Sequence, residues 1–158
     1  MLEINGLTKR YRDFTAVDGL NLTVRDGAIF GFLGHNGAGK TTTVSMLTTL
    51  ILPTSGHALI NDLDIVNDNL RVRSLLGYLP ESVMLYGDMT AAENLRFFGK
   101  LSGLDNVEEH IDETLKLLNF TEWKNKKVRE FSKGMRQRVG IAQAILHRPK
   151  ILFLDEPT

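Results

Sequence analysis

Residues 34–41 read Gly34-His35-Asn36-Gly37-Ala38-Gly39-Lys40-Thr41 and fit the pattern G-x-x-x-x-G-K-[ST] of a phosphate-binding loop, or P-loop. The apolar segment 28–33 precedes this stretch and predicts a buried strand, and a helix is predicted from Thr42 to about Leu50. Strand, glycine-rich loop and helix are the context that a P-loop needs. A glycine turn that merely joins a strand to a helix is the alternative, but the lysine, the hydroxyl and both flanks favour the P-loop.

The loop offers phosphate ligands of several kinds. Glycines let backbone N–H groups turn toward an anion, and the N-terminus of the following helix adds the positive end of its dipole. Lys40 can reach the outer phosphates, where it would also serve catalysis, and Thr41 can offer its hydroxyl to Mg2+. The candidate nucleotide-binding residues in this stretch are Gly34, His35, Asn36, Gly37, Ala38, Gly39, Lys40, Thr41 and Thr42.

Composition narrows the class of protein. The 158 residues suffice for one domain with a core, and 42% apolar and 24% charged residues are ordinary for a soluble globular protein. The formal net charge of zero gives no indication of a nucleic acid partner, and the basic run 124–127 is more typical of a solvated face. There are no cysteines, no signal-peptide pattern, and no window with the roughly 18 apolar residues of a membrane helix.

The remaining patterns predict an α/β protein. Residues 2–9 alternate weakly and predict an edge strand, and residues 13–19 predict turns. Further strands are predicted at 20–24, 57–61 and 77–80, and helices at 67–76, 90–102, 107–118 and from 133. Thr90 and Glu93 form a capping box, and Ser132 is a plausible N-cap. We therefore expect the residues from approximately 88 to 135 to form a helical insert in the α/β core.

An apolar run at residues 151–154 predicts a buried parallel strand that ends in two acids. At a strand tip Asp155 can hold Mg2+, because a hard cation prefers oxygen ligands, and Glu156 can act as a general base on an attacking water. An ordinary acidic turn is the alternative. The P-loop favours the catalytic interpretation, because the two motifs belong to the same phosphoryl-transfer chemistry.

Three features together resemble the ATP-binding cassette (ABC) family: the P-loop, the Ser-x-Gly element 132–134 and the acidic strand that follows. The resemblance implies a P-loop NTPase core of the ABC ATPase type, with an N-terminal antiparallel β subdomain and an α-helical subdomain. It also implies that Ser132 and Gly134 bind the γ-phosphate of an ATP held by the partner subunit. Tyr11 matches the aromatic that stacks on adenine, although it could also be a core or edge tyrosine.

Two departures from the family pattern refine the resemblance. Glu81 stands where the family usually has a glutamine that approaches Mg2+, and residues 131–135 read Phe-Ser-Lys-Gly-Met instead of Leu-Ser-Gly-Gly-Gln. In both departures this sequence resembles the ATPase subunits of ABC-2-type exporters. Residues 84–89 form an apolar loop, and in the family this region touches the membrane subunit. The alternative to such an interface is that the loop simply packs onto the helical insert.

The resemblance implies an ATPase that couples ATP binding and hydrolysis to export. The expected partners are a transmembrane permease and a second ATPase subunit, identical or paired, in a head-to-tail ATP sandwich at the cytoplasmic face of the cell membrane. Alternatives are a soluble ABC module in translation or DNA maintenance, and an inactive fragment. The family continues past Thr158, so residues 1–158 are expected to be a single ABC domain that is incomplete at its C-terminus, unstable in isolation and with negligible turnover.

Overall fold

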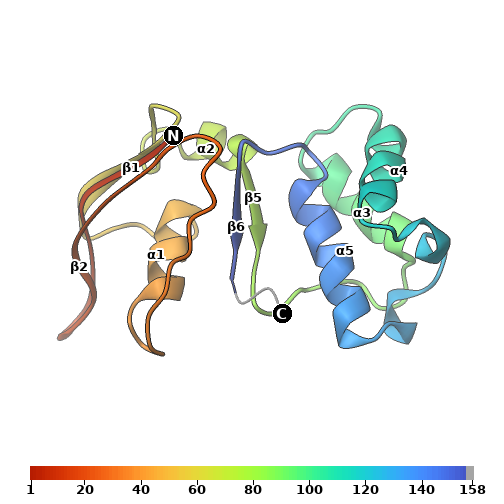
Figure 1. The fold of residues 1–158 in the computed structure, drawn as a ribbon, viewed down its shortest axis with the longest axis horizontal. Helices are drawn as coiled ribbons and strands as arrows, with labels where there is room; N and C mark the ends of the chain where they lie inside the picture. The colour runs from red at the N-terminus through yellow and green to blue at the C-terminus, as the bar shows by residue number, and fades with distance from the viewer. Residues whose placement is uncertain (156–158) are drawn as a thin grey trace. The chain divides into compact units, whose positions relative to one another are not determined.

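The computed structural model describes residues 1–155, which divide into two compact units (Figure 1). The first unit comprises Met1–Ser74, and the second begins at Leu75. The first unit contains a four-stranded antiparallel sheet in the order β2-β1-β3-β4. Its strands are β1 (Leu2–Tyr11), β2 (Phe14–Val24), β3 (Ser55–Ile60) and β4 (Leu63–Asp64). The predicted antiparallel β subdomain is therefore confirmed.

β1 is an inner strand of this sheet, and the prediction of an edge strand at residues 2–9 is wrong. It pairs with β2 on one side and with β3 on the other. Both pairings shift register around Gly6, whose φ is +59°, and this bulge breaks the alternation of the strand. Ile4 and Leu7 are consequently both buried, although they are three positions apart and a regular strand would place them on opposite faces. The weak alternation in the sequence reflects a bulge and not an exposed edge.

β2 includes most of residues 13–19, for which the sequence predicts turns. The hairpin turn is confined to Arg12 and Asp13, and Arg12 has a φ of +51°. Gly19 also has a positive φ, and its N–H donates to Thr8 Oγ1 at 2.9 Å. The small and polar residues of this stretch therefore mark a distorted strand, because a bulge uses the same residue types as a turn.

Segment 28–33 is not a strand in the structure, which contradicts the sequence prediction. Ile29 and Leu33 are almost completely exposed, and half of Phe30 is exposed. An apolar run becomes a buried strand only where neighbouring strands satisfy its backbone and cover its side chains. None of the strands within residues 1–155 pairs with this segment.

The first unit contains α1 (Lys40–Leu47) and all but the last residue of α2 (Asn69–Leu75). α1 ends three residues earlier than predicted, because Thr49 has a φ of +61° and Leu50 N–H bonds back to Ser45 O at 2.9 Å. The core of this unit gathers buried apolar side chains from the sheet and the helices, among them Leu2, Ile4, Leu7, Met46, Ile60 and Val72.

The second unit pairs two parallel strands, β5 (Leu76–Leu79) and β6 (Ile151–Leu154). Its helices are α3 (Ala91–Leu101), α4 (Val107–Leu117) and α5 (Lys133–Ile145), with the short 3-10 helices η1 (Thr121–Trp123) and η2 (Val128–Glu130) (Figure 1). β6 is a parallel strand, as predicted, but Leu152 and Leu154 of β6 are exposed. The prediction that β6 is buried is wrong for residues 1–155, where β5 is its one partner.

The helices of the second unit have a core of their own. Leu95, Ile111, Leu115, Phe120 and Val139 are almost completely buried in one apolar cluster. The capping box is confirmed, since Thr90 Oγ1 accepts from Glu93 N–H and the Glu93 carboxylate accepts from Thr90 N–H. No helix within residues 1–155 is long and apolar enough to cross a membrane.

Candidate nucleotide-binding site

The P-loop residues lie between segment 28–33 and α1, and glycine is required where the backbone turns. Gly37 and Gly39 have φ values of +83° and +82°, in the left-handed region. Gly39 is the N-cap of α1, and a Cβ at this position would overlap the backbone oxygen of Ala16. A Cβ at Gly37 would meet nothing within 4 Å. The loop therefore needs glycine at residue 39 for space and at both positions for conformation.

This difference predicts unequal costs for two matched substitutions. Gly37→Ala should lower the free energy of unfolding by about 1 kcal/mol, from the left-handed backbone alone. Gly39→Ala should cost about 1–3 kcal/mol more, because the methyl group also displaces the β2 backbone at Ala16. Urea unfolding of the two variants measures the difference, and equal costs would contradict the close approach described for Gly39.

The N-terminus of α1 is open to an anion. The first N–H groups of a helix have no partner within it, and α1 has no side-chain cap and no acidic residue in its first turn. Lys40 Nζ donates to Gly34 O at 2.7 Å and to His35 O at 3.0 Å, so the ammonium group lies over the loop. Thr41 is exposed at the same helix end. Backbone donors, the helix dipole and the lysine charge of this loop suit a phosphate chain.

Tyr11 ends β1 in the same unit, and its side chain is not part of the core. The residue is 46% exposed, and Lys9 Nζ lies 5.0 Å from the centre of its ring. An exposed ring that already contacts a cation is suited to stacking. The assignment of Tyr11 to adenine stays a prediction.

The carboxyl ends of β5 and β6 bring acidic residues to one edge of the parallel pair. Leu79 is paired with Leu154, and Asp155 N–H donates to Leu79 O at 2.9 Å. Glu81 is exposed and follows β5 by two residues. Burial raises the pKa of Tyr78, and the nearby carboxylate of Asp155 raises it further. This edge is where open parallel sheets place their ligand-binding residues.

The donor atoms at these positions fit Mg2+, which prefers carboxylate and hydroxyl oxygens. Asp155 and Glu81 lie in the second unit, and Thr41 lies in the first. The structure therefore defines the position of each of these residues within its own unit. Within residues 1–155 no three His, Asp or Glu side chains gather into a metal site of their own. Glu156, the predicted general base, lies outside the described residues.

The Ser-x-Gly element lies at the start of α5, as predicted. Ser132 is the N-cap, and its Oγ accepts from Met135 N–H at 3.3 Å. Ser132, Lys133 and Gly134 are all exposed, and a Cβ at Gly134 would meet nothing within 4 Å. The first turn of α5 carries no acidic residue. This helix end therefore also suits a phosphate group approaching from outside the unit.

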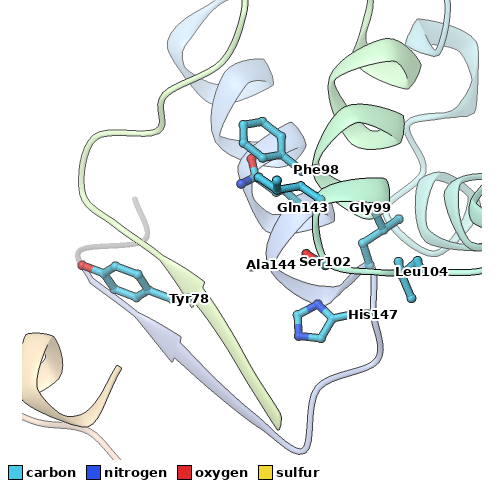
Figure 2. A pocket seen from close by; sticks show the side chains of 10 residues that line it. Tyr78, Phe98, Gly99, Ser102, Leu104, Gln143, Ala144 and His147 are labelled. Carbon is cyan, nitrogen blue, oxygen red and sulfur yellow. The ribbon is translucent and has the colours of Figure 1, made fainter. Parts of the chain in front are cut away.

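A cavity of about 160 Å³ opens in the second unit (Figure 2). Tyr78 of β5, Phe98 of α3 and Gln143 of α5 line it, together with His147, whose Nε2 is 2.7 Å from Leu76 O. None of the sequence-predicted site residues contributes to its wall. The candidate nucleotide site at the P-loop therefore shares no residue with this cavity.

Asn94 is a fully buried polar residue on α3 that the sequence motifs do not identify. Its side chain holds the backbone of Tyr86 and Thr90 through hydrogen bonds. The available signal was a polar residue on the apolar face of the predicted helix, between Ala91 and Leu95.

The chain is similar in sequence to known proteins. The protein-family model described as "ABC transporter" matches residues 17–158. The chain is 40% identical over 160 residues to the probable multidrug ABC transporter ATP-binding protein YbhF of Escherichia coli (strain K12), an alignment that covers 100% of this chain and 28% of that protein. It is 42% identical over 158 residues to the bacitracin transport ATP-binding protein BcrA of Bacillus licheniformis, covering 100% of this chain and 51% of that protein. The chain thus spans about half the length of BcrA and less of YbhF.

A solved structure shares the fold. The ATP-binding cassette MJ0796, in a dimeric post-hydrolysis state bound to ADP and Pi, is 26% identical and superposes with a TM-score of 0.86. The superposition covers 100% of this chain and 75% of that one. The predicted P-loop NTPase fold of the ABC ATPase type is therefore confirmed.

Proposed function

Because the chain belongs to the ABC transporter family, we propose that it forms the ATP-binding part of an export ATPase that hydrolyses ATP to ADP and phosphate and drives a transmembrane permease. The observation that carries this proposal is the P-loop geometry. Lys40 is held over the loop carbonyls, at a helix N-terminus without a cap or a nearby acid. Such an arrangement binds and orients a phosphate chain and stabilises the charge that develops on it during transfer.

The residues around the loop divide the work of binding and catalysis. Backbone N–H groups from the loop and from Thr42 hold the phosphates, and the ring of Tyr11 stacks on adenine. Thr41, Asp155 and Glu81 would hold Mg2+, which neutralises phosphate charge when it is bound. Glu156 takes a proton from the attacking water as general base. Each of these roles uses the oxygen, nitrogen or π surface that its residue type supplies.

The other half of the site comes from a second subunit. Ser132 and Gly134 lie exposed at the N-terminus of α5, where a hydroxyl, free N–H groups and the helix dipole face outward. In a head-to-tail dimer this element closes on the γ-phosphate of ATP held by the partner. ATP binding closes the dimer and hydrolysis reopens it. The dimeric state of the MJ0796 cassette with ADP and Pi bound supports the dimer in this proposal.

An exposed apolar surface of the second unit suits the permease. Met84 is 86% exposed, and Tyr86 and Phe97 are each about half exposed. The rings of Tyr86 and Phe97 pack edge to face, 5.2 Å apart. We name Met84, Tyr86 and Phe97 the docking patch and assign it to an apolar helix of the permease. We propose that the ATPase works at the cytoplasmic face of the membrane.

Reconstitution tests the proposed function. The full-length protein that contains this chain is purified with the membrane protein that co-purifies with it, and both are placed in proteoliposomes. We expect Mg2+-dependent ATP hydrolysis that rises when the permease is present. Hydrolysis that is indifferent to the permease, or a protein that does not bind ATP, would contradict the proposal.

A further inference from the structure

We infer that Asn94 is a positioning residue that connects the docking patch to the Ser132 end of α5. This inference rests on the proposed function, because it assigns a role in communication between the permease and the nucleotide. Neither a nucleotide nor the permease has to touch Asn94 for this role. The residue acts through the backbone of the loop that carries Met84 and Tyr86 of the patch.

The Asn94 side chain forms hydrogen bonds with both the backbone N–H and the backbone oxygen of one residue of that loop. Its Oδ1 accepts from Tyr86 N–H at 2.8 Å, and its Nδ2 donates to Tyr86 O at 3.0 Å. Nδ2 also donates to Thr90 O at 3.0 Å. The side chain is fully buried, so these bonds have no competition from water. One amide thus fixes the place of Tyr86, whose ring also stacks on Phe98 at 6.1 Å.

The fixed loop is in turn bonded to the segment that leads to α5. Arg129 N–H donates to Gly87 O at 2.9 Å, and Val128 N–H donates to Met89 O at 3.0 Å. Thr90 continues this contact through a bridge to Lys127. Two segments that are joined by successive backbone hydrogen bonds, as paired strands are, should move together.

The last step reaches Ser132 through a short buried stretch. Val128 and Phe131 are buried in the helical core, and Phe131 N–H donates to Val128 O at 3.0 Å. Arg136 Nη1 donates to Phe131 O at 2.6 Å, which ties this stretch to the first turn of α5. A displacement of Tyr86 by the permease therefore has a continuous hydrogen-bonded route to the N-cap of α5.

The alternative tie between the segments is weaker. Arg129 Nη1 donates to Asp88 Oδ1 at 2.8 Å, but both side chains are largely exposed, and exposed ion pairs contribute little. Loss of the Asn94 amide leaves the N–H and the oxygen of Tyr86 without their buried partner. Asn94 is therefore the residue whose removal should free the loop.

Hydrogen exchange on the full-length protein tests the structural part. In Asn94→Leu, which keeps the side-chain size, and in Asn94→Ser, which is smaller and polar, we expect the amides of Tyr86, Val128 and Arg129 to exchange about tenfold faster. The control is Leu115→Val, a substitution in the same core that leaves the loop bonds intact. Unchanged exchange at Val128 and Arg129 in both Asn94 variants would overturn the inference.

Hydrolysis with the permease tests the functional part. We expect both Asn94 variants to bind ATP normally and to lose about tenfold of the permease-dependent stimulation of hydrolysis, whereas Leu115→Val retains it. Full stimulation in both Asn94 variants would overturn the inference and leave the proposed function intact. A wild-type protein without any stimulation would instead overturn the proposed function, and with it the role in communication given to Asn94.

Discussion

We expect the Lys40→Ala variant of the full-length protein to hydrolyse ATP at least about 100-fold more slowly than the wild type. The ammonium group lies over Gly34 O and His35 O, at the N-terminus of α1, where we propose that the outer phosphates bind. Its removal takes away a positive charge directed at the transferred phosphoryl group. A phosphate-release assay at saturating ATP measures the loss.

The fold should survive this change. The carbonyl groups that Lys40 bonds belong to exposed residues, and water can replace the ammonium group. Thermal unfolding of Lys40→Ala should therefore resemble that of Lys100→Ala, which removes an exposed lysine of α3. Lys100→Ala should keep wild-type hydrolysis. Normal hydrolysis by Lys40→Ala would contradict the assignment of the P-loop.

The second large effect is expected for Glu156→Gln. This change keeps the shape of the side chain but removes its ability to accept a proton, so hydrolysis should slow by about 10²–10⁴. ATP binding should persist, because the P-loop is intact. The dimer should then accumulate with ATP bound, which size-exclusion chromatography with and without ATP detects.

A matched substitution separates catalysis from charge. Glu122→Gln removes one exposed carboxylate at η1, far along the chain from the acidic strand end, and should change neither hydrolysis nor the oligomeric state. If Glu156→Gln turned over ATP as fast as Glu122→Gln, Glu156 would not be the general base.

Local signals in the sequence predicted the helix starts of the second unit correctly. The capping box of Thr90 and Glu93 and the N-cap at Ser132 both form as expected. These features depend on residues within one helical turn, so the sequence contains all the information needed to predict them. The parallel strands β5 and β6 were also recognisable, because each is a short apolar run with a clear boundary.

Pairing between distant segments was predicted less well. Segment 28–33 has the composition of a buried strand, but burial depends on neighbours that the local pattern does not name. The inner position of β1 was hidden by the bulge at Gly6, which breaks the period of two. Both errors arise because strand patterns report which faces are apolar, and not which strands lie beside them.

In the candidate site, too, local features were predictable from the sequence and contacts between distant segments were not. The P-loop is contiguous, so Lys40 and the glycines were identifiable from spacing, and the structure adds the close approach of Gly39 to Ala16. Asn94 could not be predicted to bond Tyr86, because an asparagine in a helix is usually exposed. Its role became visible only when the loop was placed beside α3.

The most direct test of the shared site mixes two inactive variants of the full-length protein. Lys40→Ala disables the P-loop, and Gly134→Asp puts a negative charge at the start of α5, so each variant alone should be inactive. In a mixed head-to-tail dimer one site would combine both defects, and the other would combine an intact P-loop with an intact Ser132 element. We predict that mixing restores hydrolysis to about a quarter of the wild-type rate, since half of the randomly formed dimers contain one intact site. A mixture as inactive as its parents would contradict a nucleotide site shared between two subunits.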